Sequence, residues 1–503
     1  MEIIPKLNTF IDLRTRSTRV PVAGQERVEN LAPALLYEKL FKDQSDSFLF
    51  ESGKGPEATA RYSIMGASHE GSVTLLNSTV TVSKNGTKES ESDDLLSGFS
   101  ALNFEETTLD VEYLPHFWGG WVGFLGYEIA GALENLSILK KPNHLTPDMY
   151  FIKVERLVVY DHRLKQLKYI VSPNTKGSSE DLYKKTAEEI KNFWRSIRSA
   201  LNEIPFNPVT PKNKELASNK NGNVDGPSPH LQSDITRSQY LNIVDRAKKY
   251  IEEGDIYQAN LSQRFETECK VDPFELYKKL RYINPSPFAG FLKFKDLVII
   301  SSSPERLLKL ENKVLETRPI AGTRPRGQNE MEDEFLAREL LLNEKEKAEH
   351  LMLVDLERND LGRVCEYGSV TVTDLMFLEK YSHVTHIVSN IKGILKPDVT
   401  VLEILRALFP GGTITGCPKI RCMEIINQLE TSSRGPYSGS FGYIGFSRRM
   451  DFNIIIRTIL MKGSKAWFHV GAGIVADSIP EKEYQETLDK AAAMIKVLTP
   501  ENN

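Results

Sequence analysis

Cysteine and long apolar runs are both scarce in this chain of 503 residues. The four cysteines form no C-x-x-C pair, so neither a disulfide framework nor a zinc site is expected from Cys269, Cys365, Cys417 and Cys422. No apolar run approaches the roughly 18 residues that a membrane span requires. The start, MEIIPKLNTF, also lacks a basic region followed by an apolar core. We therefore expect a cytoplasmic protein without a membrane partner.

A strong excess of charge of one sign is missing too. The formal net charge is -4, which gives no reason to expect nucleic acid or an anionic membrane as a partner. The hydrophobic share of 40% and the charged share of 26% are typical of a globular protein. The chain is long enough for two or three domains and a substantial core.

The composition divides the chain into three parts. Residues 204–234 are rich in Pro, Asn, Ser, Gly and Lys and contain little that could be buried, which predicts a linker or exposed loop. We expect an N-terminal regulatory or structural region at 1–203 and a catalytic region at 235–503. No repeat of 20–50 residues is visible, which excludes solenoids and propellers.

Apolar periodicity predicts alternating helices and strands. Helices are expected at residues 31–42, 181–203, 236–252, 334–350, 399–408, 418–429 and 481–497. β-like runs occur at residues 47–52, 72–77, 78–84, 156–161, 167–172, 370–375, 386–391 and 452–460. Thr236 is expected to cap the helix that ends at Gly254. This pattern predicts an α/β or α+β core.

Two Glu-x-x-Glu pairs indicate a metal site. Glu346 and Glu349 lie three residues apart in a predicted helix, as do Glu483 and Glu486, and residues at i and i+3 share one helical face. Carboxylates on one face repel each other unless a cation such as Mg2+ lies between them. A solvated surface helix is the alternative for either pair alone. The repetition favours the metal site.

Glycines near the C-terminus indicate an anion site. FPGGTITGCPK places a glycine run before a helix that can begin at Cys417, where backbone amides and a helix N-terminus suit a carboxylate. It is not a Walker A loop, because Cys417 and Pro418 precede Lys419. Alone the run is typical of a structural turn. Gly471, Gly473 and Arg457, the last on an apolar strand, strengthen the anion-site interpretation.

From about residue 236 to 498, ordered motifs connect these features. They are GDIYQANLSQRF (254–265), NPSPF (284–288), SSSPE (301–305), TRPIAGTRPRG (317–327), EKAEHLMLVDLERNDLGRV (346–364), EKYSHVTHIVSNI (379–391), FPGGTITGCPK (409–419), DFNIIIRT (451–458) and GAGIVADS (471–478). The chain thereby resembles the chorismate-utilising enzymes, and among them component I of anthranilate synthase or of aminodeoxychorismate synthase.

The resemblance implies an α+β fold in which large β-sandwich-like sheets are flanked by helices, with the active site in a cleft of the C-terminal half. It implies chorismate as substrate, with contacts from Gly322, Thr323, Tyr437, Arg457, Gly471, Ala472 and Gly473. It also implies Mg2+ as cofactor, with Glu349 and Glu486 as ligands and Glu346 and Glu483 as supports.

Three further residues match positions of catalytic interest in the family. His386 matches the active-site histidine and is expected to act as general acid or base. His383 lies nearby, but without a Cys or third His in register it indicates no zinc. Glu305 is expected to be a further acid–base group. Gln258 stands where water-using relatives carry a lysine base, which favours an amine nucleophile.

The resemblance also implies a regulator and a partner. Ser52, in FES, together with Pro287, Phe288 and Ala289 matches the two halves of a regulatory tryptophan pocket, although the family motif usually has methionine where this chain has Ala289. No cysteine lies in a G-x-C-x-G nucleophile turn. A separate glutamine amidotransferase subunit is therefore expected to supply ammonia.

The product depends on conflicting motifs. Many aminodeoxychorismate synthases place a nucleophilic lysine where PIAGT has Ala321, and alanine cannot form the covalent adduct. SPERLL, PGGTITG and ADSIPEKEYQET, by contrast, are closer to the aminodeoxychorismate branch. The missing nucleophile favours anthranilate as product. A non-catalytic chorismate or tryptophan sensor would predict a damaged metal site, whereas all four glutamates are present.

Overall fold

The computed structural model describes residues 1–17, 19–51, 61–68, 70–102, 104, 109, 111–134, 136, 146–173, 177–204, 231–380 and 384–499. Ser52 and most of the expected linker at 204–234 lie outside these ranges. Among the described helices, none combines the length and the apolar character that crossing a membrane would require.

Two large, mainly antiparallel sheets form the centre of the described structure. The first has 13 strands, in the order β1 (Glu2–Ile4), β2 (Val22–Arg27), β11 (Gln166–Val171), β10 (Arg156–Asp161), β4 (Tyr62–Ala67), β3 (Asp46–Glu51), β14 (Phe288–Phe294), β15 (Leu297–Ser303), β24 (Thr458–Lys462), β25 (Lys465–Ile474), β13 (Gln258–Glu268) and β12 (Gln232–Ser233), with β21 (Gly416–Cys417) paired to β13. The second has 12, in the order β18 (Ile320–Pro325), β20 (Val384–Ile394), β17 (Val314–Thr317), β16 (Arg306–Glu311), β23 (Arg449–Asn453), β22 (Ser440–Gly445), β8 (Gly120–Leu125), β9 (Met149–Val154), β5 (Gly71–Leu76), β6 (Thr79–Lys84) and β7 (Thr87–Ser92), with β19 (Thr371–Lys380) paired to β20.

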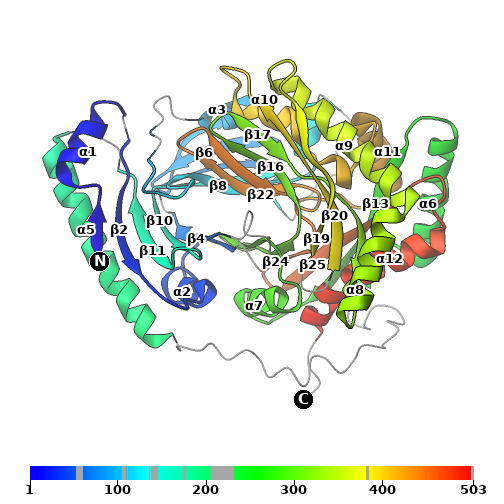
Figure 1. The fold of residues 1–503 in the computed structure, drawn as a ribbon, viewed down its shortest axis with the longest axis horizontal. Coiled ribbons are helices and arrows are strands. Elements are labelled where there is room, and N and C mark those ends of the chain that lie inside the picture. Colours follow the sequence, from blue (N-terminus) through cyan, green and yellow to red (C-terminus); the bar gives the residue numbers. More distant parts are fainter. Residues whose placement is uncertain are drawn as a thin grey trace.

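Helices cover the outer faces and the ends of the two sheets (Figure 1). They are α1 (Leu7–Arg14), α2 (Pro33–Leu40), α3 (Leu95–Ala101), α4 (Ile129–Leu133), α5 (Ser179–Glu203), α6 (Arg237–Glu252), α7 (Pro273–Ile283), α8 (Glu330–Leu342), α9 (Glu344–Val364), α10 (Val401–Leu408), α11 (Lys419–Leu429) and α12 (Pro480–Leu498). Figure 1 shows α1 and α5 at one end of the molecule and α6, α9 and α12 at the other. The expected α+β fold with sandwich-like sheets and flanking helices is confirmed.

Strands from both halves of the sequence share each sheet. In the first sheet β3 pairs with β14, and in the second β8 pairs with β22. Burial follows this arrangement: one apolar cluster fills the space around Phe48, Phe291 and Phe441, whereas another gathers α9, α10 and the second sheet around Leu308 and Phe452. The division at 204–234 thus stays a prediction about the chain, since both sheets contain strands from either side of it.

Local signals explain the helices that position the site. The Thr236 hydroxyl accepts a hydrogen bond from the backbone N–H of Gln239 in a complete capping box, as expected for α6. The helix expected at 334–350 is in fact two helices, because Asn343 ends α8 and its side chain caps α9. The helix expected from Cys417 begins at Lys419 instead, and Cys417 belongs to a short strand.

The apolar run 452–460 is not a single strand. The chain leaves the second sheet after Asn453 and enters the first sheet at Thr458. Arg457, expected on a strand, lies in this crossing with a φ of +50°. Such a backbone conformation is uncommon for a residue with a side chain and is often found at functional positions.

Candidate active site

Three elements bring Gln258, Glu349 and Gly473 together. Gln258 begins β13, where residues 259–268 pair with β25, and its amide donates a 2.7 Å hydrogen bond to Oε1 of Glu349 on α9. A Cβ on Gly473 would lie 2.5 Å from Nε2 of Gln258 and 3.6 Å from the same Glu349 oxygen. A side chain at position 473 would therefore displace the Gln258 amide from Glu349. The glycine lets the β25 backbone approach this hydrogen-bonded pair closely.

Glu346 lies on the same face of α9, beside β18. A Cβ on Gly322, which has a φ of +64°, would lie 2.9 Å from Oε2 of Glu346. Arg324 donates to the other oxygen of Glu346 at 3.2 Å. Gly322 and Glu346 therefore lie side by side, with Arg324 next to them.

The second glutamate pair lies on α12, next to β25. Lys490 pairs with Glu486 at 2.7 Å and donates to the carbonyl oxygen of Gly471 at 3.0 Å. Burial raises the pKa of Glu349, and the negative charges of Glu346 and Glu486 raise it further. The pKa of Glu483 is raised by burial and by Glu486. These shifts indicate that the glutamates of α9 and α12 face a common region.

In the part of the chain that the structure describes, the region between the glutamates of α9 and α12 lacks a complete set of protein ligands for a divalent cation, but it offers the carboxylates that Mg2+ needs. Among the described residues, no group of three or more His, Cys, Asp or Glu side chains is arranged to hold a metal ion. Mg2+, however, usually binds through one or two carboxylates together with an anionic substrate and water. Glu349 and Glu486, whose charges repel each other across the site, fit this less demanding arrangement.

His386 lies on β20 opposite Thr323 of β18. Its Nδ1 and the Thr323 hydroxyl are 2.9 Å apart. Burial lowers the pKa of His386 to about 3, and the positive charge of Arg457 contributes. The imidazole is therefore neutral at physiological pH and, in this ligand-free state, a weak base that can take part in hydrogen bonds without carrying a positive charge.

Glu305 has a pKa that is shifted upward, in contrast to that of His386. It lies between β15 and β16, is 5% exposed, and its Oε1 has no hydrogen-bond partner among the described residues. Burial raises its pKa from 4.5 to about 7, although the cations Arg457 and Lys490 oppose this. A carboxyl group with a pKa near 7 is about half protonated at neutral pH and can donate a proton there.

Tyr437 and the β25 glycines complete the region. A Cβ on Gly471 would lie 2.7 Å from the Tyr437 hydroxyl and 2.5 Å from Oδ1 of Asn260. Tyr437 stacks on His469, with ring centroids 5.1 Å apart. Ala472 is fully buried in the cluster formed by α6, α11 and β13, so its side chain faces away from the two glycines.

Two of these residues were not expected from the sequence. Asn260 carries a buried Oδ1 without a hydrogen-bond partner among the described residues, and it follows Gln258 by two positions in QANLSQ, so both lie on one side of β13. Lys490 lies four residues after Glu486, and that spacing was a signal available in the sequence.

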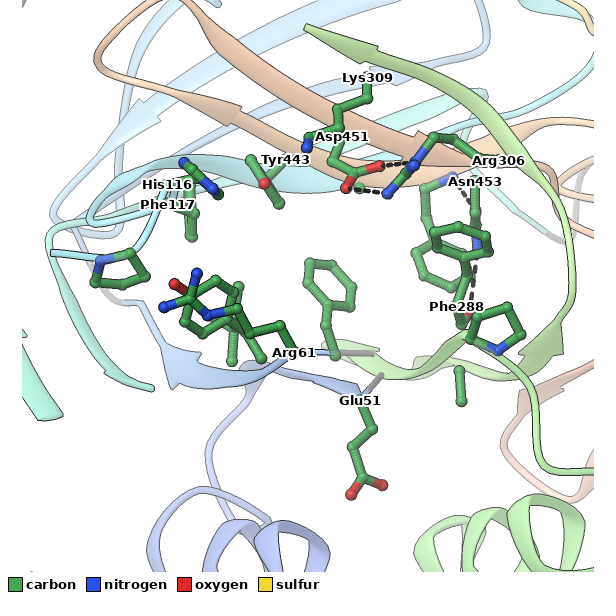
Figure 2. A pocket seen from close by; sticks show the side chains of 18 of the residues that line it. Glu51, Arg61, His116, Phe117, Phe288, Arg306, Lys309, Tyr443, Asp451 and Asn453 are labelled. Carbon is green, nitrogen blue, oxygen red and sulfur yellow. Dashed lines mark hydrogen bonds and ion pairs between the residues drawn. The ribbon is translucent and has the colours of Figure 1, made fainter. Parts of the chain in front are cut away.

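A separate cavity of about 440 Å³ lies between the sheets (Figure 2). Pro287, Phe288 and Ala289 line it, together with Phe50, whereas Ser52 lies outside the described residues. The remaining described lining residues are Glu51, Arg61, Tyr62, Ile64, Pro115, His116, Phe117, Arg163, Arg306, Lys309, Phe441, Gly442, Tyr443, Asp451 and Asn453. None of the candidate catalytic residues belongs to this described lining.

One acidic residue of the cavity wall is directed elsewhere. In Figure 2 the Glu51 side chain points away from the cavity, toward the helices. It accepts a 2.8 Å hydrogen bond from Tyr277 and pairs with Arg281 at 2.9 Å. Glu51 is thus a structural anchor between β3 and α7.

Taken together, the two sheets and the residues at their junction define a candidate enzyme site, with paired acidic residues on two helices and the buried Glu305 and His386. Comparison with known families agrees with the motifs. A family model described as "chorismate binding enzyme" matches residues 32–496. The chain belongs to the family of chorismate-binding enzymes.

Individual relatives span almost the whole chain. It is 40% identical to "Anthranilate synthase component 1" of Acetivibrio thermocellus, over 95% of each chain. It is 43% identical to "Aminodeoxychorismate synthase component 1" of Bacillus subtilis, over 92% of this chain and 93% of that one. The crystal structure of anthranilate synthase component I from Streptococcus pneumoniae superposes with a TM-score of 0.71 at 34% identity, covering 93% of this chain and 99% of that one.

Proposed function

We propose that this chain is the large component of an anthranilate synthase, which converts chorismate and ammonia to anthranilate and pyruvate in tryptophan biosynthesis. The observation that carries the proposal concerns two positions where relatives have a lysine. Position 258 is a glutamine that holds Glu349, and position 321 is the buried Ala321. Gln258 cannot act as the base that activates water, and Ala321 cannot form a covalent adduct, so ammonia itself would attack the ring.

Chorismate would bind beside the glycines of β18 and β25, where the absence of side chains leaves room for a ligand. Gly322, Thr323, Gly471, Gly473 and Tyr437 would border the ring and its side chain. Arg457 would pair with a substrate carboxylate. Glu349 and Glu486 would hold Mg2+, with Glu346 and Glu483 as supports. When bound, Mg2+ would neutralise a substrate carboxylate and act as a Lewis acid.

The acid–base groups suit two successive steps. In the first, the nitrogen of ammonia forms a bond to C2 while the C4–O bond breaks. Glu305 would give its proton to the leaving hydroxyl, which departs as water, and the ammonium group at C2 would lose a proton. In the second, the C2 proton would leave as the C3–O bond breaks, and the departing pyruvate enolate takes up a proton. His386 would take the C2 proton once the negative charge of the bound substrate raises its pKa, which burial and Arg457 lower in the free chain.

The product test uses the purified chain with chorismate, Mg2+ and an ammonium salt. We expect anthranilate and pyruvate in equal amounts, detected by chromatography with fluorescence. The alternative is aminodeoxychorismate synthase, favoured by the 43% identity to the Bacillus subtilis protein of that name. Para-aminobenzoate that forms only when a separate lyase is added, with no anthranilate, would overturn the leading proposal.

Ammonia would come from glutamine through a separate amidotransferase subunit. The relatives named above are each called a component 1, which supports a partner chain. The sequence itself contains no G-x-C-x-G nucleophile turn.

The cavity between the sheets would hold tryptophan as a feedback inhibitor. Phe50, Pro287 and Phe288 offer apolar surface to an indole ring, and Asp451 offers a carboxylate to an ammonium group. Ala289 leaves more room than the methionine of the usual motif, so we expect weak binding. Calorimetry that shows no binding at millimolar tryptophan would remove this regulatory role and leave the catalytic proposal intact.

A further inference from the structure

The two crossings between the sheets lie side by side. The chain passes from β15 to β16 through Pro304 and Glu305 alone, and it returns from β23 to β24 through residues 454–457. The backbone N–H of Ile454 donates to the carbonyl oxygen of Glu305 at 3.0 Å. The Ser303 hydroxyl donates to the Ile454 carbonyl at 2.5 Å. Glu305 and Arg457 therefore belong to one hydrogen-bonded junction.

The residue that follows Glu305 faces the cavity. Arg306 is 6% exposed and binds Asp451 through two hydrogen bonds of 2.9 and 3.1 Å, which Figure 2 shows in the cavity wall. Arg306 also pairs with Glu316 at 3.3 Å, and its guanidinium lies 4.9 Å from the ring centre of Phe288. Because neighbouring side chains in extended backbone point to opposite faces, this anchoring directs Glu305 away from the cavity.

We propose that Arg306 is a positioning residue, whose two-pronged bond to Asp451 fixes the place of the Glu305 carboxyl group in the candidate active site. The inference rests on the proposed catalytic role of Glu305. A linker of two residues has almost no slack, so a shift of Arg306 must move Glu305 as well. Planar, bidentate pairs such as this one restrict geometry more than a single ammonium contact can.

Arg306→Lys tests this, because it keeps the charge and removes the planar fork. Loosening the crossing should admit water to Glu305 and reduce the burial that raises its pKa. The alkaline limb of the kcat/KM profile should then move to lower pH by about one unit. We also expect a fall in kcat of about ten- to hundredfold with little change in KM for chorismate. Asp451→Asn, which keeps the shape of the partner, should shift the limb in the same direction.

The charged groups that face Glu305 stay unchanged in these variants. They are Arg457 in the neighbouring crossing, Lys490 on α12 and Glu357 on α9. Arg449→Lys is the matched control. Arg449 of β23 is also a buried arginine, but it stands opposite Glu311 at the far end of the β16–β23 ladder and donates to Oδ1 of Asn312 at 3.2 Å. In this control variant the alkaline limb of the kcat/KM profile should lie at the same pH as in the wild-type chain.

Chorismate consumption is the readout, so the identity of the product does not affect the result. The inference would be overturned if a folded Arg306→Lys chain kept both its kcat and the alkaline limb of its kcat/KM profile unchanged. It would also be overturned if Arg449→Lys shifted that limb as far as Arg306→Lys does. If Arg306→Lys does not fold, Asp451→Asn decides by the same criteria. If the wild-type chain consumes no chorismate, the proposed function fails instead. The pKa of Glu305, measured by isotope-edited infrared difference spectra against Glu305→Gln, then decides whether Arg306 positions this group.

Discussion

Replacing Glu305 by glutamine should remove both the acid and its pH signature. Burial raises the pKa of Glu305 to about 7, so about nine-tenths of the chains carry the proton at pH 6 and about one-tenth at pH 8. If this proton goes to the leaving hydroxyl, kcat/KM for chorismate should fall roughly tenfold between pH 6 and pH 8 and about tenfold for each further unit. Glu305→Gln should lose about 10²- to 10⁴-fold in rate and show no such limb.

The assay follows chorismate consumption from pH 5.5 to 9 with saturating Mg2+ and a constant concentration of unprotonated ammonia. Holding the ammonia constant matters, because its own titration would otherwise hide the limb. A variant within about threefold of the wild-type rate would refute the reasoning, since general acid catalysis contributes at least about 10²-fold. A wild-type profile without an alkaline limb near pH 7 would also contradict it.

Stability provides a second measurement on the same pair of proteins. A carboxyl group with a raised pKa in the folded state stabilises the fold fully below its unfolded pKa of 4.5, and this contribution is lost as the pH rises through about 7. The shift corresponds to roughly 3 kcal/mol at most. Glu305→Gln should therefore be more stable than the wild-type chain at pH 8, but not at pH 4, in urea unfolding. If the two proteins had equal free energies of unfolding at pH 8 and at pH 4, the buried position of the Glu305 carboxyl group would be contradicted.

Three further outcomes follow from the site and its support. Glu349→Gln and Glu486→Gln should each abolish turnover at saturating Mg2+. Neither should lower the melting temperature measured without metal, because burial and the charge of Glu486 disfavour the charged form of Glu349. Near-normal activity in both variants would rule out the ligand assignment. In the wild-type chain the Lys419 ammonium lies 2.5 Å from the Asp360 carboxylate. Lys419→Met should lower the free energy of unfolding in urea by about 3–5 kcal/mol, because it leaves Asp360 as a buried unpaired charge. A decrease below about 1 kcal/mol would refute this. The isolated chain should use ammonium salts but not glutamine, and glutamine consumption by the purified chain would argue against a separate amidotransferase.

Local chemistry made the helices of the site predictable. Thr236 and Gln239 form the capping box that begins α6, and Pro480 begins α12. The break between α8 and α9 had a signal as well, since Asn343 precedes Glu346 by three residues, a spacing typical of a helix N-terminus. Helix-forming residues continue on both sides of the break, so apolar periodicity alone predicts one helix there.

The crossings between the sheets were not predictable in the same way. DFNIIIRTIL reads as one continuous apolar strand, and both strands that it contributes to are buried on both faces. Nothing in such a run marks the place where the chain changes sheets. The polar lining of the cavity was even less visible, because Arg61, His116, Arg306 and Asp451 are far apart in the sequence and belong to no common motif.

The crossings explain how one fold can place a cavity and an active site so close together. Each sheet has a face toward the other, and the cavity lies in the gap between them. Where the chain crosses that gap, neighbouring residues must serve opposite sides. Arg306 lines the cavity while Glu305 belongs to the candidate site, and Asn453 lines the cavity while Arg457 lies four residues further along the same crossing. A molecule that spread or tightened the gap would therefore reach Glu305 and Arg457 through only a few residues of backbone. If the cavity is regulatory, as proposed, its effect would need no long pathway through the core.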